Sequence, residues 1–93
     1  MESEKATERY LKTRVKELGG HCYKWVSPNI KGVPDRICLF PGGKTIFIEL
    51  KSEGKYPTEL QYFMLEKLRT LGFYATYADT KARVDTALKE ALS

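Results

Sequence analysis

The sequence predicts an α/β fold in which helices flank a mixed β-sheet of four strands. Three observations support this prediction. Apolar residues recur with helical spacing in three segments, and four short β-branched or aromatic runs lie between them, bounded by Gly, Pro or Ser. The order of these elements is helix, three strands, helix, strand, helix. Two hairpin connections followed by a β-α-β crossover imply both antiparallel and parallel pairing in one sheet.

The first half of the chain predicts one helix and three strands. Helical periodicity begins near Glu4 and ends at the Gly19-Gly20 pair, which is a natural stop for a helix. The strands are expected over residues 21–26, 35–40 and 45–51. Residues 27–34 are rich in Ser, Pro, Asn and Gly, so they predict a loop. A Pro-Gly-Gly turn joins the second strand to the third, which makes this pair a hairpin.

The second half predicts a helix, a strand and a last helix. Thr58 and Gln61 have the spacing of a capping box, which opens a helix that runs to about Leu71. Residues 73–78 form the fourth strand, and Thr80 caps the helix that follows. The expected apolar stripe of the middle helix comprises Leu60, Phe63, Met64, Lys67, Leu68 and Leu71.

Length and composition exclude several classes of protein. The 93 residues suit a single domain over residues 1–93, and 16 basic against 12 acidic side chains leave a net charge of +4. The longest uncharged stretch, residues 70–78, is too short to cross a bilayer, and the first residues do not resemble a signal peptide. Two cysteines and one histidine provide neither a disulfide framework nor a zinc site. We therefore expect a cytoplasmic protein without membrane contact, with Cys22 and Cys38 as small buried thiols.

Two charged residues stand out in the third strand, which is otherwise apolar. Alternation along the strand predicts two faces, with Ile46, Ile48 and Leu50 on one and Phe47, Glu49 and Lys51 on the other. A central strand is a costly place for two charges unless something compensates them. The hairpin turn brings the start of the second strand beside the end of the third. We therefore expect Asp35 to lie alongside Glu49.

Two converging carboxylates form a hard oxygen site that suits Mg²⁺ or Mn²⁺. Such an ion polarises a phosphodiester and lowers the pKa of a bound water. Lys51, next to the pair, would orient or deprotonate that water or neutralise charge on the phosphate. Glu8 projects from the first helix and would complete the metal shell, directly or through water. The alternative is structural: Asp35 and Glu49 would then be a plain hairpin pair, with Arg36 or Lys51 as salt-bridge partners.

The spacing of these residues resembles that of a known nuclease superfamily. Pro34-Asp35 is followed by thirteen residues and then by Glu49-Leu50-Lys51. This pattern resembles the PD-(D/E)XK nucleases, whose restriction-endonuclease-like αβββαβ core matches the predicted order, with one extra C-terminal helix. The resemblance is closer to the VRR-NUC (virus-type replication-repair nuclease) family in its stand-alone phage form. The other features that match the family are the Gly19-Gly20 pair, Tyr23-Lys24, residues 27–36 (SPNIKGVPDR), residues 47–51 (FIELK), Gln61 and residues 71–73 (LGF). Together the matched features span the chain from about Glu4 to Asp85.

The resemblance implies a set of site residues. Asp35 and Glu49 would be metal ligands together with the carbonyl of Leu50, and Lys51 would be the catalytic lysine. Gln61 matches a glutamine that lies near the active site in the family, although the capping box accounts for it equally well. Either Glu4 or Glu8 matches the family's acid on the first helix. Glu8 is preferred because it lies further inside the helix.

The resemblance also implies a metal-dependent endonuclease that hydrolyses DNA. The chain has no room for a module that reads sequence, so we expect selection by DNA shape, at branched structures such as Holliday junctions. Symmetric cutting of a junction needs two sites, which favours a homodimer built on exposed aromatic residues of the 21–26 strand or on the last helix. The basic residues expected to hold phosphates are Lys24, Lys31, Arg36, Lys44 and Lys55.

Two other functions stay open. One is a flap or RNA nuclease of the same fold, acting as a monomer. The other is a catalytically silent subunit that binds nucleic acid; the presence of Asp35, Glu49 and Lys51 argues against it. The sequence leaves undecided which DNA structure is preferred, whether one or two ions bind, and the source organism.

Overall fold

The computed structural model describes residues Met1–Ser93 and confirms the predicted α/β class. Its elements are α1 (Glu4–Glu17), β1 (His21–Lys24), β2 (Arg36–Phe40), the 3-10 turn η1 (Pro41–Gly43), β3 (Lys44–Leu50), α2 (Glu59–Thr70), β4 (Tyr74–Ala78) and α3 (Lys81–Leu92). The order agrees with the order predicted from the sequence. No helix of the structure has the length and apolar character that a membrane span requires.

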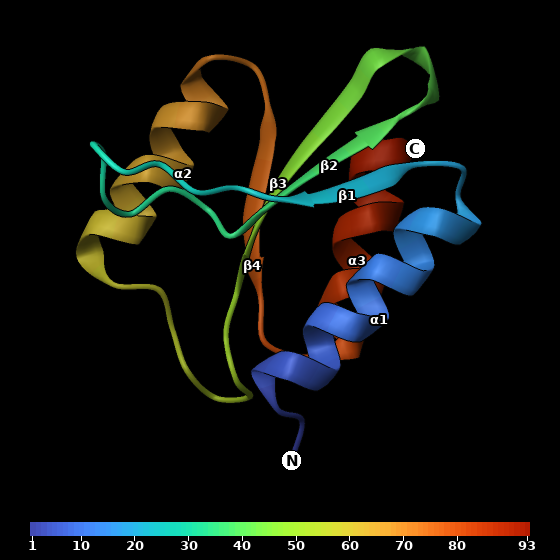
Figure 1. Cartoon of the computed structure of the whole chain (residues 1–93), viewed down its shortest axis with the longest axis horizontal. Helices are drawn as coiled ribbons and strands as arrows, with labels where there is room; N and C mark the ends of the chain where they lie inside the picture. The colour runs from blue at the N-terminus through green and yellow to red at the C-terminus, as the bar shows by residue number, and fades with distance from the viewer.

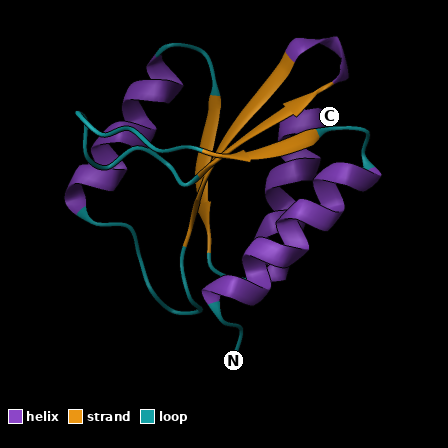
Figure 2. Ribbon diagram, in the orientation of Figure 1, coloured by secondary structure: helices purple, strands orange, loops and turns teal.

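The four strands form one mixed sheet in the order β1-β2-β3-β4. The β1/β2 and β2/β3 pairs are antiparallel, and β3/β4 is parallel, as the crossover through α2 requires. Helices α1 and α3 lie together on one face of the sheet, and α2 lies on the other (Figures 1 and 2). The mixed sheet flanked by helices is therefore confirmed.

The Gly-Gly pair after α1 ends the helix as expected. Gly19 has a φ of +80°, which side chains other than glycine rarely adopt, and the N–H of Gly20 bonds back to the carbonyl of Val15 at 2.9 Å. A Cβ on Gly20 would lie 2.6 Å from the carbonyl oxygen of Leu39. Only glycine therefore lets the chain turn this closely against β2 and begin β1.

Side chains on the two faces of the sheet form two separate cores. The larger core lies between the sheet and the α1/α3 pair; its buried members include Leu11, Val15, Cys38, Ile46, Ile48, Leu50, Val84 and Leu88. The smaller core lies under α2 and consists of Phe47, Leu65, Leu68 and Ala75. Ile46, Ile48 and Leu50 thus share one face of β3 and Phe47 the other, as predicted. The partly buried Trp25, Ile37 and Tyr77 pack against this smaller core.

The predicted apolar stripe of α2 is partly wrong. The helix buries Leu65 and Leu68, whereas Leu60, Phe63 and Leu71 are exposed. Apolar residues occupy more than one side of this helix, so periodicity alone does not select the side that meets the sheet. The side that packs inward is set by the sheet: Phe47 and Ala75 offer only a small apolar area, and the row that contains Leu65 and Leu68 covers it.

The capping box at the start of α2 is confirmed. The Thr58 hydroxyl accepts from the N–H of Gln61 at 3.2 Å, and the Gln61 side-chain oxygen accepts from the N–H of Thr58 at 2.9 Å.

We expect Thr58→Ala to lower the free energy of unfolding by about 1 kcal/mol, because the N–H of Gln61 loses its acceptor. Chemical denaturation measures the change. Thr13→Ala, an exposed threonine inside α1 that caps nothing, is the control and should not destabilise the chain. Equal unfolding midpoints for Thr58→Ala and the unchanged protein would contradict the capping argument.

Candidate active site

The β2–β3 hairpin brings Asp35 and Glu49 together. Arg36 pairs with Ile48 in the antiparallel register, so Asp35, one residue earlier, stands opposite Glu49, one residue later. One Asp35 carboxylate oxygen, Oδ2, accepts from the N–H of Leu50 at 2.8 Å. This bond holds the Asp35 side chain against the end of β3, as the hairpin prediction requires.

Glu49 is a buried carboxylate with incomplete compensation. Its side chain is 3% exposed, and Oε2 lies 3.6 Å from the Lys51 Nζ. The other oxygen, Oε1, is buried and has no hydrogen-bond partner. A buried, unpartnered carboxylate oxygen is costly, so the structure leaves a position that a donor or a cation would satisfy.

The surroundings of Glu49 disfavour its charge. Burial, followed by the neighbouring Asp35 carboxylate, raises the pKa of Glu49 to about 7, while the Lys51 ammonium opposes the shift. Near neutral pH this carboxyl group therefore exchanges its proton readily. A cation bound there would favour the charged form in the same way as Lys51 does, but more strongly.

Lys51 follows β3 on the same face as Glu49 and reaches the surface. Its side chain is 18% exposed, and its backbone N–H donates to the carbonyl of Ala78 on β4 at 3.1 Å. Between the two residues, the N–H of Leu50 points to Asp35. The carbonyl of a strand residue points to the same side as its N–H, so the Leu50 carbonyl also opens toward the Asp35 side.

Glu8 lies on the opposite side of the sheet from Glu49. Its carboxylate is 3.0 Å from the Arg36 guanidinium, and this hydrogen bond lowers the pKa of Glu8. Arg36 points to α1, whereas the alternation of β2 directs Asp35 to the other face. No group of three or more His, Cys, Asp or Glu side chains converges in the structure. Glu4, the other helix-one candidate, is exposed and forms no ion pair.

The other predicted site residues are only partly brought together. Gln61 uses its side-chain oxygen in the capping box. Lys24 is exposed on β1 and, as the register partner of Arg36, projects to the α1 face, away from the carboxylate pair. Lys31 and Lys55 are exposed in the loops after β1 and β3, while Arg36 is buried against Glu8.

Lys44 is not brought to the carboxylate pair. It opens β3, five residues before Glu49, which is roughly 17 Å along an extended strand. Its ammonium donates instead to the carbonyl of Ala91 in α3 at 2.8 Å.

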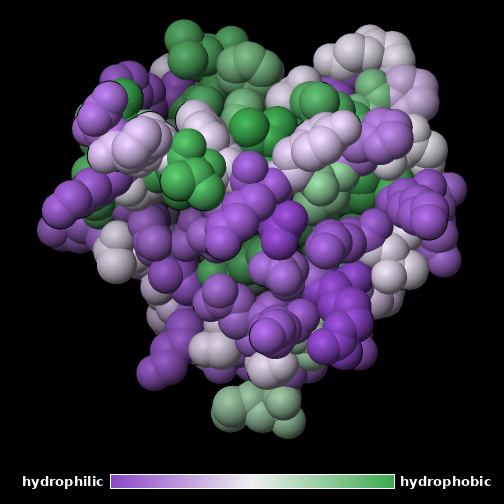
Figure 3. Space-filling model, in the orientation of Figure 1, coloured by the Kyte–Doolittle hydropathy of each residue, from purple (hydrophilic) through white to green (hydrophobic).

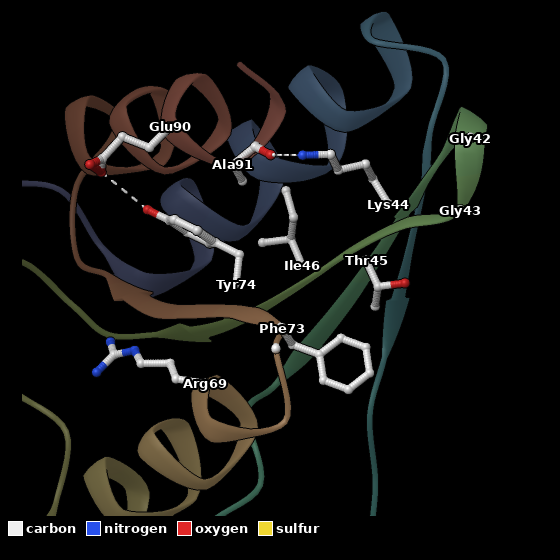
Figure 4. Close-up of a pocket in the computed structure, with 11 residues that line it drawn as sticks. Gly42, Gly43, Lys44, Thr45, Ile46, Arg69, Phe73, Tyr74, Glu90 and Ala91 are labelled. Carbon is white, nitrogen blue, oxygen red and sulfur yellow. Dashed lines mark hydrogen bonds between the residues drawn. The ribbon is translucent and has the colours of Figure 1, made fainter.

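The largest cavity also lies at this far end of the sheet. It has a volume of about 640 Å³ and lies among the start of β3, the start of β4 and the end of α3 (Figure 4). Tyr74 donates to Glu90 beside it at 3.1 Å, next to the Lys44 contact. Neither Asp35 nor Glu49 lines any cavity. The carboxylate pair therefore lies apart from every cavity, with Glu49 buried and Asp35 half-buried.

A positioning residue that the sequence analysis missed is Asp79, directly after β4. Its Oδ2 accepts from the N–H of Gly54 at 2.8 Å, and its Oδ1 lies 3.0 Å from Arg83. Asp79 thereby fastens the loop that follows Lys51. The contact joins residues 25 positions apart, so no local pattern in the sequence predicts it.

Comparisons with known proteins identify similar chains. No protein-family model matches the chain. The chain is 40% identical over 78 residues to "Putative nuclease p44" of Acyrthosiphon pisum secondary endosymbiont phage 1, covering 84% of each protein. It is also similar to a solved structure described as "VRR_NUC domain", with 28% identity, 97% of each chain covered and a TM-score of 0.86. The chain therefore belongs to the VRR-NUC family of nucleases, in the form found in phages.

Proposed function

We propose that this nuclease is a divalent-metal-dependent endonuclease that hydrolyses phosphodiester bonds in branched DNA, such as Holliday junctions. The observation that carries the proposal is the Asp35–Glu49 pair with Lys51 beside it, in which one buried Glu49 oxygen has no partner. As a phage-type protein, it would act in the cytoplasm of the host.

The donor set fits Mg²⁺ or Mn²⁺. Carboxylate and carbonyl oxygens are the ligands these hard ions prefer, and Asp35, Glu49 and the Leu50 carbonyl are the groups proposed to hold the ion. The bond from the Leu50 N–H to Asp35 and the unpartnered Glu49 oxygen support this set. When bound, the ion would supply positive charge to the phosphate and to the attacking water. Glu8, the proposed acid of the first helix, would join this donor set only after leaving Arg36, which holds it on the α1 face, away from Glu49.

Lys51 is the proposed catalytic lysine. Its ammonium is held by Glu49 yet remains partly exposed, so it can face both the carboxylate and a phosphate lying on the surface. A compact ammonium there donates hydrogen bonds to the attacking water or to the phosphate oxygens. Protonated Glu49 is a poor partner for Lys51, so the charged form of the glutamate is needed to keep the lysine in place.

The proposed specificity is for DNA shape, with the phosphate backbone as the main contact. The proposed phosphate contacts are exposed Lys31 and Lys55, in the loops after β1 and β3, and Lys24, which projects to the α1 face. Figure 3 shows hydrophilic side chains gathered over the lower half of the viewed face, beyond the end of β3, and hydrophobic ones over the upper half.

Symmetric cutting of a junction leads us to propose a C₂ homodimer. Of the aromatic residues proposed for its interface, Trp25 is half-buried and packs on Phe47 with ring centroids 5.3 Å apart. Tyr23 is 54% exposed and remains a candidate, as does α3. Sedimentation velocity with and without junction DNA tests the dimer: a monomer in both conditions would refute it.

The first experiment is cleavage of a labelled four-way junction, beside a linear duplex of equal length, in Mg²⁺, Mn²⁺ and EDTA. We expect paired nicks in the junction only, present with either metal and absent in EDTA. A 5′-flap and a single-stranded RNA serve as further substrates. Preferential cleavage of the flap or the RNA would overturn branched-junction specificity. Junction binding without cleavage in either metal would indicate the catalytically silent subunit instead.

A further inference from the structure

Strands β1 and β2 place the two cysteines of the chain directly opposite each other. Cys22 and Cys38 are register partners, and their sulfur atoms are 3.9 Å apart. The N–H of Trp25 bonds to the carbonyl of Asp35 at 2.8 Å, which marks that pair as a hydrogen-bonded one. Alternation along an antiparallel ladder then makes the cysteine pair a non-hydrogen-bonded one, where facing side chains approach most closely.

The two thiols are not equivalent. Cys38 is completely buried, and its thiol donates a hydrogen bond to the sulfur of Cys22, which is only half-buried. This hydrogen bond, together with the positive charges of Arg36 and Lys12, lowers the pKa of Cys22 against the effect of burial. The same contact and burial raise the pKa of Cys38. Cys22 is therefore the thiol that reacts first, as its thiolate, and Cys38 is the thiol that reacts second.

A basic hollow leads to Cys22. A cavity of about 350 Å³ is lined by Cys22 together with Lys12 and Lys16 of α1, and both lysines are exposed. Neither lysine forms an ion pair within the chain. A reagent that carries carboxylates would be attracted to these two charges and brought to the Cys22 sulfur.

We propose that Cys22 and Cys38 form a reversible oxidation site for anionic small-molecule disulfides, of which glutathione disulfide is the probe. The Cys22 thiolate attacks one sulfur of the reagent, forms a mixed disulfide and releases one thiolate. The Cys38 thiol then attacks the Cys22 sulfur and expels the second thiolate, and its proton ends on a released glutathione thiolate. In total, two protein thiols are oxidised to one disulfide, and one glutathione disulfide is reduced to two glutathione molecules.

The fold accommodates this bond without moving the strands. Facing residues in non-hydrogen-bonded pairs have Cα atoms about 4.5 Å apart, within the range of roughly 4.4–6.8 Å that disulfides span. The bond would close a ring around residues 23–37, which include the loop that leads to Asp35. Both ends of that loop would then be tied, and the unfolded chain would lose conformational freedom.

Intact-mass spectrometry after treatment with glutathione disulfide tests the proposal. We expect a single product lighter by two hydrogen atoms, without retained glutathione and without thiols reactive to maleimide after denaturation. Its Tm should exceed that of the reduced protein by roughly 10 °C, because the ring restricts the unfolded state. Dithiothreitol should restore both the mass and the Tm. A persistent mixed disulfide, disulfide-linked dimers or an unreacted protein would each overturn the proposal.

Variants separate the roles of the two thiols and the lysines. Cys38→Ala should stop at the mixed disulfide, whereas Cys22→Ser, a change at a half-exposed position, should leave Cys38 unreacted. Lys16→Gln should slow the reaction with glutathione disulfide several-fold and leave the rate with neutral 2-hydroxyethyl disulfide unchanged. Lys89→Gln, an exposed lysine of α3 that lines a different cavity, is the matched control. Equal rates for Lys16→Gln and Lys89→Gln would refute the role of the basic hollow.

Discussion

Asp35→Asn is expected to lower the rate of metal-dependent cleavage by at least roughly 10²–10³-fold, the scale seen when one preorganised electrostatic group is removed from an active site. The substitution removes one of the two proposed metal-binding carboxylates. The amide oxygen of asparagine can still accept from the N–H of Leu50, so the end of β3 should keep its position. Single-turnover cleavage of the junction measures the rate, and calorimetric titration with Mn²⁺ should show weaker binding.

Lys51→Ala provides the contrasting case. We expect a loss of cleavage of similar size with Mn²⁺ binding retained, because Lys51 is proposed to act on the water and the phosphate rather than to hold the ion. Asp85→Asn is the control. Asp85 contacts Tyr10 and Arg14 between α1 and α3, so the variant should cleave the junction at the normal rate. If either Asp35→Asn or Lys51→Ala cleaved at the full rate, the site assignment would be wrong.

The second large effect is on stability. In EDTA, the free energy of unfolding is expected to fall by about 3 kcal/mol between pH 4.5 and pH 7 through Glu49 alone. The pKa of Glu49 is raised from its ordinary 4.5 to about 7, so over this window the unfolded chain has released a proton that the folded chain retains. Stability from this group is complete below pH 4.5, decreases as the pH rises, and is constant above about pH 7.

Glu49→Gln isolates this contribution. The neutral amide keeps the shape of the side chain and removes its titration, so the variant should match the unchanged protein at pH 4 and exceed its stability at pH 8. Urea denaturation at both pH values gives the difference, and Glu66→Gln, an exposed acid of α2, is the control. Adding Mg²⁺ at pH 8 should stabilise the unchanged protein and not Glu49→Gln. A pH-independent difference between the two proteins would refute the burial argument.

Local chemistry in the sequence was sufficient to predict much of this protein. The order of helices and strands follows from periodicity and from Gly, Pro and Thr at the boundaries. The hairpin turn predicts that Asp35 lies beside Glu49, because a short antiparallel connection leaves little choice of register. Alternation predicts that Glu49 and Lys51 share the face of Phe47. Each of these depends on residues close in the chain or joined by one turn.

Only the tertiary structure decided which partners the other charges have. Arg36 takes Glu8 across the α1 interface, so the predicted helix-one acid faces away from Glu49. The length of β3 separates Lys44 from the carboxylate pair, and Asp79 fastens the loop after Lys51. Likewise, the row of α2 that packs inward was chosen by Phe47 and Ala75. These contacts join elements distant in the chain, where a side chain's partner depends on how the layers stack and not on the residues beside it.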